Sequence, residues 1–236
     1  MKIINTADNQ ITFQVEVEET LANAIRRYFH HVPVIAIDEV EISKNDSPLY
    51  DETLAHRIGL VPFKMNKSSK NVNKLKLKVK KEGMVLSSEF EGDLKPVYGE
   101  IPLTHLDKGQ EVDIVSQTKV GTGEEHAKFL PGLMFYRNLV KVILDKSLES
   151  EIKDVCKNNP IKEKAGKIVV EDNQKKGVSD FCEGICEKAG KSVEIVPSNE
   201  LVISIESFGQ LDVKDIFEKS VEILKKDLQE VVKAVK

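Results

Sequence analysis

The chain has 236 residues, which is enough for one large domain or two to three small domains with a real hydrophobic core. Its net charge of −4 excludes a protein that binds nucleic acid through a basic excess, and no apolar run reaches the roughly 18 residues of a membrane span. The three cysteines are an odd number and argue against the disulfide framework of a secreted protein, so we expect a cytoplasmic protein.

A hairpin and a helix are predicted at the start of the chain. Residues 11–17 alternate between apolar and polar side chains, which indicates a half-buried strand, and with residues 1–5 they predict a hairpin. Thr20 is the expected N-cap of a helix that ends near His31, because Pro33 keeps the residue before it out of the helical region. The apolar face of this helix contains Leu21, Ala24, Ile25, Tyr28 and Phe29.

The middle of the chain has the pattern of a β protein. Strands are expected at 34–42 and at 74–80, where lysines alternate with apolar side chains. Further strands are expected near 84–90, 111–120, 133–144, 167–171, 193–197 and 201–207. Between about 148 and 190 the pattern changes to short helix, strand, loop and short helix, which we interpret as a small inserted domain.

The last predicted element is a long helix that Asp212 can cap. Its apolar residues step by three and four over about three heptads. They are Val213, Phe217, Val221, Leu224, Leu228, Val231 and Val235. Such a helix spans about 36 Å, more than a small domain needs for its own core. Packing within the domain and pairing with another subunit both fit the pattern, and the length favours pairing.

The most informative stretch is 20–42 together with 54–62. It joins an amphipathic helix with paired arginines to a strand and an Ala-His-Arg-x-Gly-Leu-x-Pro loop. Further segments follow in the order Ile101-Pro-Leu, Lys108-Gly-Gln-Glu-Val and Val120-Gly-Thr-Gly-Glu-Glu-His-Ala-Lys-Phe-Leu-Pro131. In this order of segments the chain resembles the alpha-like subunits of multisubunit RNA polymerases. It is most similar to the archaeal members, which are the counterparts of the third-largest subunit of eukaryotic RNA polymerase II.

The resemblance implies an α+β fold in which both chain ends form an alpha-like dimerisation domain. A mainly β domain is inserted into it, and a small ferredoxin-like insertion follows. For this chain we expect these domains at 1–45 with 198–236, at 46–147 with 193–197, and at 148–192.

The resemblance also implies a function in assembly. The chain would be a non-catalytic subunit of DNA-directed RNA polymerase, a nucleotidyltransferase complex active in transcription. It would form a heterodimer with subunit L and, joined by subunits N and P, a platform for the second-largest catalytic subunit. No direct, specific contact with nucleic acid is expected.

The expected interface with subunit L lies on the two terminal helices. Its residues are Leu21, Ala24, Ile25, Phe29, Val213, Phe217, Val221, Leu224, Leu228 and Val231. Contacts with the other subunits are expected at charged residues of the signature, namely Arg26, Arg27, Asp51, Glu52 and Arg57. Arginine forks pair with carboxylates in desolvated interfaces, whereas a solvent-exposed ion pair stabilises by at most about 1 kcal/mol. Both interpretations stay open for each of these residues.

The three cysteines fall short of an iron–sulfur motif, which reads C-x2-C-x2-C-x3-C-P. Cys182 and Cys186 keep only the last spacing, and counting back by threes gives Ser179 and Lys176 where thiolates are needed. Cys156 adds a third thiol upstream. We expect no cofactor and no metal, with a three-iron cluster as the less favoured alternative. The segment should fold on its apolar residues, which include Ile161, Ile168, Val170, Phe181 and Ile185.

No catalytic motif is recognisable. Gly121-Thr-Gly123 suggests a phosphate loop, but Glu124 and Glu125 follow it directly and would repel a phosphate. We expect no catalysis by this chain alone. The alternatives are a small ferredoxin-like redox or electron-transfer protein, and a homodimer in the manner of bacterial alpha.

Overall fold

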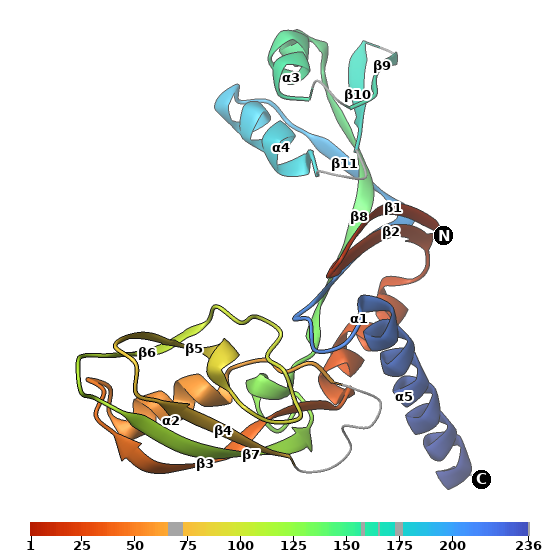
Figure 1. The fold of residues 1–236 in the computed structure, drawn as a ribbon. Helices are drawn as coiled ribbons and strands as arrows, with labels where there is room; N and C mark the ends of the chain where they lie inside the picture. Colours follow the sequence, from red (N-terminus) through yellow and green to blue (C-terminus); the bar gives the residue numbers. More distant parts are fainter. Residues whose placement is uncertain (66–72, 157–158, 165, 173–176, 236) are drawn as a thin grey trace. The chain divides into compact units, whose positions relative to one another are not determined.

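The computed structural model describes residues 1–65, 73–156, 159–164, 166–172 and 177–235. It has a mixed α/β fold that divides into two units (Figure 1). Unit 1 comprises Met1–Asn23 and Met134–Ile205, and unit 2 comprises Ala24–Leu133 and Glu206–Lys236. The expected three-domain division has other boundaries and stays a prediction.

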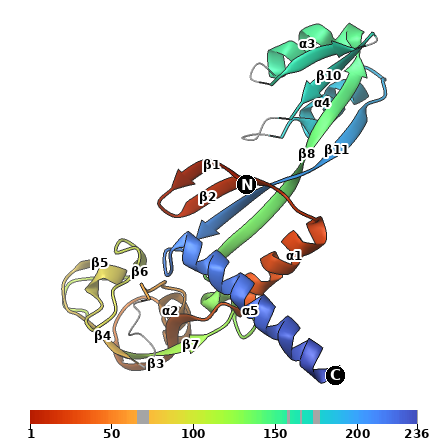
Figure 2. The same ribbon diagram turned by 90° about the vertical axis from the view of Figure 1, so that its right-hand side faces the viewer.

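Unit 1 is built on a six-stranded sheet. Its strands are β1 (Lys2–Ala7), β2 (Gln10–Glu16), β8 (Gly132–Asp145), β9 (Ile161–Lys164), β10 (Lys167–Glu171) and β11 (Glu194–Ser207), in the order β1-β2-β11-β8-β10-β9. The predicted opening hairpin is confirmed, since β1 and β2 pair antiparallel. The long strands β8 and β11 run side by side (Figures 1 and 2). The prediction of two separate strands at 193–197 and 201–207 was wrong, because β11 continues through Pro197.

Two short helices, α3 (Glu149–Val155) and α4 (Ser179–Lys188), share an apolar core with β8 and β10. Ile168 and Val170 of β10 are buried, as expected. The expectation that Phe181 is buried was wrong, because 45% of it is exposed. Cys182 and Cys186, one turn apart, occupy the inner face of α4, and Phe181 lies on the neighbouring face.

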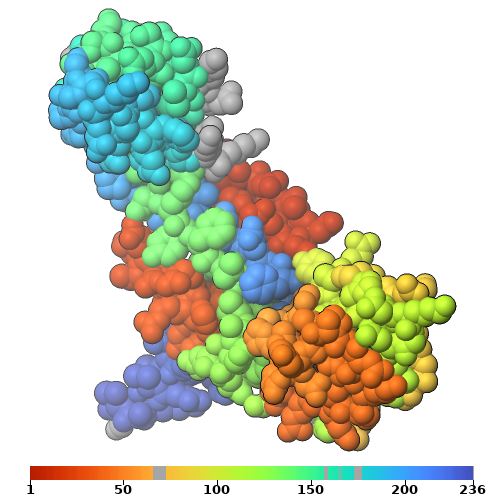
Figure 3. Space-filling view, turned by 90° about the vertical axis from the view of Figure 1, so that its left-hand side faces the viewer, coloured from red at the N-terminus to blue at the C-terminus, as the bar shows by residue number. Residues whose placement is uncertain are grey.

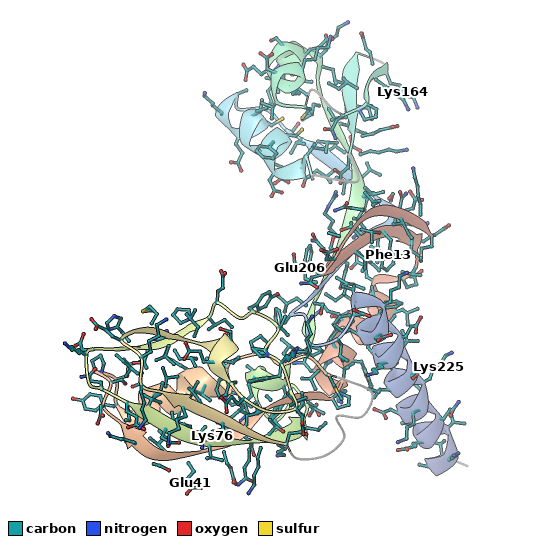
Figure 4. All side chains as sticks on the ribbon, in the orientation of Figure 1. Phe13, Glu41, Lys76, Lys164, Glu206 and Lys225 are labelled. Atoms are coloured by element: carbon teal, nitrogen blue, oxygen red, sulfur yellow. The ribbon has the colours of Figure 1, made fainter. Side chains whose placement is uncertain are left out.

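Unit 2 contains two smaller sheets. The first has the order β3-β7-β4, formed by β3 (Val34–Asn45), β7 (Val112–Gly121) and β4 (Lys74–Val79). The second pairs β5 (Gly83–Leu86) with β6 (Pro102–Leu106), a strand that the sequence pattern missed. The apolar side chains of β4 are buried and its lysines are exposed, which confirms the predicted alternation. Lys76, for example, lies on the outer face (Figure 4).

The signature segment 54–62 was expected to be a loop, but most of it belongs to helix α2 (Asp51–Gly59). Leu54 and Ile58 lie one turn apart and are fully buried. Asp51 and Glu52 occupy the first turn of the helix, where carboxylates are stabilised by the positive end of the helix dipole. The helix stops before Pro62, which cannot donate a helical hydrogen bond.

The two helices of the expected interface are present. Helix α1 (Glu19–Tyr28) continues into a 3-10 turn, Phe29–His31. The prediction of Thr20 as the N-cap was wrong. The amide of Ala22 already donates a helical hydrogen bond to the carbonyl of Glu18, so Thr20 lies inside the helix. Helix α5 (Val213–Ala234) matches the predicted long helix, although the side chain of Asp212 makes no capping hydrogen bond. No helix in the described ranges is long and apolar enough to cross a membrane.

Candidate partner interface

Helix α5 has an inner stripe that is buried within the chain itself. Its buried residues are Val213, Ile216, Ser220 and Leu224, spaced by three or four positions. The Ser220 hydroxyl donates to the Phe217 carbonyl over 2.7 Å, so this small polar side chain is satisfied in a completely buried position. The inner stripe fixes the first three turns of α5 and ends at Leu224.

The outer half of α5, residues 225–234, carries apolar side chains that no described part of the chain covers. Leu228 and Val231 are 56% and 58% exposed, and Val232 is similarly exposed. Ten helical residues extend about 15 Å. The space-filling view shows this dark blue segment projecting from its unit (Figure 3), and Lys225, its first residue, points into open space (Figure 4). A monomer rarely leaves such a contiguous apolar stripe in water, so the stripe indicates a protein partner.

Helix α1 adds a second apolar surface. Ala22 and Phe29, two turns apart, are buried, whereas 47% of Leu21 is exposed. Ala24 and Ile25 are half-buried between these extremes. The 3-10 turn that follows α1 contacts α5 within unit 2.

The predicted interface residues divide into three groups. Leu21, Leu228 and Val231 are exposed; Ala24, Ile25, Phe217 and Val221 are half-buried; Phe29, Val213 and Leu224 are buried in the chain itself. The three buried residues support the helices from within the chain, and their contact with a partner stays a prediction. Sequence reasoning missed Ile216 and Ser220 of the inner stripe. Their four-residue spacing to Leu224 was a usable signal, but a serine interrupts the apolar pattern.

The charged residues of the signature lie on two different helices. Arg26 and Arg27 are in the last turn of α1, with Arg26 half-buried and Arg27 exposed. On α2, Asp51 accepts a hydrogen bond from the Asn45 amide over 2.8 Å, and Arg57 donates to the Pro102 carbonyl over 2.5 Å. Glu52 is exposed beside Asp51. Asp51 and Arg57 therefore already have partners within the chain, and their intersubunit contacts stay a prediction.

The three cysteines are free thiols in the core of unit 1. Burial, together with the neighbouring Cys156, raises the pKa of Cys182 to about 12, and burial also raises the pKa of Cys186. In the part of the chain that is described, no group of three or more His, Cys, Asp or Glu side chains is arranged to hold a metal ion. Ser179 begins α4, whereas Lys176 lies outside the described residues. The expected lack of a cluster stays a prediction.

Comparison with known proteins decides the family. A family model described as the RNA polymerase Rpb3/Rpb11 dimerisation domain matches residues 12–228, a span that includes α1 and most of α5. The chain belongs to this family. The Rpb3/Rpb11 description agrees with a pair of terminal helices that leave an apolar surface open.

Relatives from archaea, each named DNA-directed RNA polymerase subunit Rpo3, agree with the Rpb3/Rpb11 family match. The protein of Pyrococcus horikoshii is 32% identical over 95% of this chain and 93% of its own length. That of Methanobrevibacter smithii is 33% identical over 69% of this chain and 67% of its own length. That of Archaeoglobus fulgidus is 26% identical over 100% of this chain and 97% of its own length. The predicted relation to an archaeal alpha-like subunit is confirmed.

Proposed function

We propose that this chain is a non-catalytic assembly subunit of DNA-directed RNA polymerase, which pairs through α1 and α5 with an L-like subunit. The observation that carries the proposal is the outer half of α5, whose apolar residues lie on a rigid helix and are exposed among the described residues. Family membership identifies the kind of partner, because the family is described by its dimerisation domain. The relatives' name favours this function over the ferredoxin-like redox alternative.

The physical basis of pairing is the burial of apolar surface between helices. Leu228 and Val231 lie three residues apart and form one stripe, which a second amphipathic helix can cover. Such a pair removes apolar area from water, which stabilises by about 25 cal/mol for each Å². Ala24 of α1 is small and half-buried, so it permits close approach of a partner element.

The finer assignment of partners is also a proposal. Subunit L would cover α5 and α1, while subunits N and P and the second-largest catalytic subunit would dock on the charged signature residues. Arg27 and Glu52 support this assignment, since both are exposed and can pair with opposite charges of another chain. The net charge of −4 supports a position away from nucleic acid, and we place the protein in the cytoplasm.

We further propose that the segment 148–192 is a ferredoxin-like insertion without a cluster. The buried cysteines support this, because they pack as small apolar side chains among Ile152, Ile168 and Val170. Elemental analysis of anaerobically prepared protein tests it. Three or more irons per chain would contradict the proposal, and a substoichiometric trace of iron agrees with it.

Sedimentation of the isolated chain, with and without an archaeal L subunit, tests the central proposal. We expect a one-to-one complex that forms only when both chains are present. A homodimer that excludes L would support the alternative in the manner of bacterial alpha. A chain that stays monomeric with a tenfold excess of L would refute the pairing.

A further inference from the structure

We infer that a polar groove on one face of the unit 1 sheet binds a carboxylate side chain, Asp or Glu, on an extended segment of another polymerase subunit. The residues that line the groove belong to β1, β2, β8 and β11, all of them strands of unit 1. The inference rests on the proposed function, because that function supplies the other subunits. It concerns different elements from α1 and α5.

The groove arises from the pattern of side chains along the strands. Successive residues of a strand point to opposite faces of the sheet, so the buried Phe13 and Ile203 face the other way from Thr12 and Ser204. Thr12 and Ser204 are short, whereas Arg137 on the neighbouring strand is long. The groove has a volume of 470 Å³, within the roughly 300–1,000 Å³ of typical binding pockets. Ser204 is 8% exposed and therefore belongs to the floor.

The floor of the groove offers a hydrogen-bond donor. The Oγ1 atom of Thr12 and the Oγ atom of Ser204 are 3.1 Å apart and share a hydrogen bond. Two hydroxyls carry two protons, and this bond uses one of them. No other hydrogen bond joins either hydroxyl to the described part of the chain. Because both residues line the groove, the second proton is available to an acceptor that lies in it.

A positive charge lies at the wall of the groove. The guanidinium of Arg137 pairs with Asp172, and the side chain of Arg137 is 34% exposed whereas that of Asp172 is 1% exposed. Arg137 lines the groove, so the buried carboxylate fixes the position of a cation at its surface. None of the described residues that line the groove is Asp or Glu. The groove therefore presents a cation and hydrogen-bond donors without a negative charge, which complements an anion.

Two observations favour a protein carboxylate over other anions. Asp172 already compensates part of the charge of Arg137, so the groove suits a singly charged group better than a phosphate group with about two charges. Phe135 also lines the groove and is 52% exposed. Aromatic and arginine side chains together are typical of protein–protein contacts, and the net charge of −4 argues against nucleic acid. An acidic residue next to an apolar one would contact both Arg137 and Phe135.

The first part of the test identifies what lies in the groove. Phe135→benzoylphenylalanine places a photo-crosslinker there and keeps an aromatic ring at this exposed position. Assembled polymerase that contains the variant is irradiated, and the crosslinked peptide is identified by mass spectrometry. We expect a segment of another subunit with Asp or Glu next to the crosslinked site.

The second part measures the dependence on charge. A synthetic peptide with the crosslinked sequence is titrated into the full chain and followed by fluorescence anisotropy. Asn5→Asp adds a carboxylate to the lining at nearly constant shape, and should weaken binding about three- to tenfold through like-charge repulsion. Asn9→Asp makes the same change in the turn between β1 and β2, outside the lining, and should leave the affinity unchanged. Exchange of the peptide's carboxylate for an amide should weaken its binding to the unsubstituted chain.

The outcomes that overturn the inference are distinct. They are a crosslink to nucleic acid, a crosslink to a segment without a carboxylate, and the lack of any crosslink to another subunit. Equal affinities of Asn5→Asp and Asn9→Asp for the peptide also overturn it. Failure of the proposed function is seen separately, because the unsubstituted chain would then neither bind an L-like subunit nor enter the polymerase.

Discussion

Leu228 and Leu224 occupy one helix, one turn apart, but the structure gives them different environments. Leu228 is 56% exposed in the isolated chain, whereas Leu224 is 8% exposed. Leu228→Ala should therefore leave the stability of the isolated chain unchanged and weaken its complex with an L-like subunit. Leu224→Ala should destabilise the isolated chain itself.

The size of both effects follows from burial. Full burial of a leucine side chain stabilises by about 1.5–3 kcal/mol, so covering the exposed half of Leu228 contributes about 1–2 kcal/mol, or roughly a 5- to 30-fold change in Kd. Leucine-to-alanine changes in a core cost about 2–5 kcal/mol of unfolding free energy, which is the range expected for Leu224→Ala.

The assay is a pair of measurements on each variant: urea unfolding of the isolated chain, and titration with an archaeal L subunit followed by sedimentation. Gln229→Ala, on an exposed position next to Leu228, is the matched control and should change neither quantity. If Leu228→Ala binds L as tightly as the unsubstituted chain, the outer half of α5 is not the partner face. If it instead lowers the unfolding free energy by as much as Leu224→Ala, the separation into inner and outer stripes is wrong.

Three further predictions concern other parts of the molecule. A hydrogen bond from Lys128 lowers the pKa of Asp38, so the pair stabilises unit 2 above the unfolded pKa of about 3.9, and this contribution is lost as pH falls through the lower folded value. The difference in unfolding free energy between the unsubstituted chain and Asp38→Asn should therefore shrink between about pH 7 and about pH 3, and a constant difference would show that the charge is unimportant. Cys182, with its pKa raised to about 12, should react with iodoacetamide slowly in the folded protein and completely in urea, and fast labelling of folded protein would contradict its burial. Deleting 148–192 with a short Gly/Ser linker should preserve L binding by gel filtration, because Lys191 Nζ lies 2.9 Å from Asp145 and the two ends are therefore close; loss of binding would show that the insertion supports the interface.

The elements that the sequence predicted well are those whose burial follows a local period. Leu75 and Leu77 alternate with exposed lysines, and their strand lies as expected. The expected loop at 54–62 failed because Gly59 and Pro62 suggest a break, whereas the two fully buried residues of α2 are fixed by the core of unit 2, which sequence spacing does not reveal. The strands predicted at 193–197 and 201–207 are likewise one strand, because the sheet carries β11 through Pro197 and the residues that follow it.

The candidate interface was only partly predictable for a related reason. A heptad-like stripe shows that α5 has an apolar face, but it does not show how much of that face its own chain covers. Ser220 is fully buried and Leu228 is mostly exposed, the reverse of what their polarity suggests.

The division of α5 into an inner and an outer stripe also has a consequence for engineering. Since the residues that hold the helix in place end at Leu224, the exposed positions beyond it can be exchanged without redesigning the fold. Charge swaps there, matched by opposite swaps on the partner, would give orthogonal pairs that assemble only with each other in one cell. Two polymerase scaffolds could then be produced side by side from nearly identical genes.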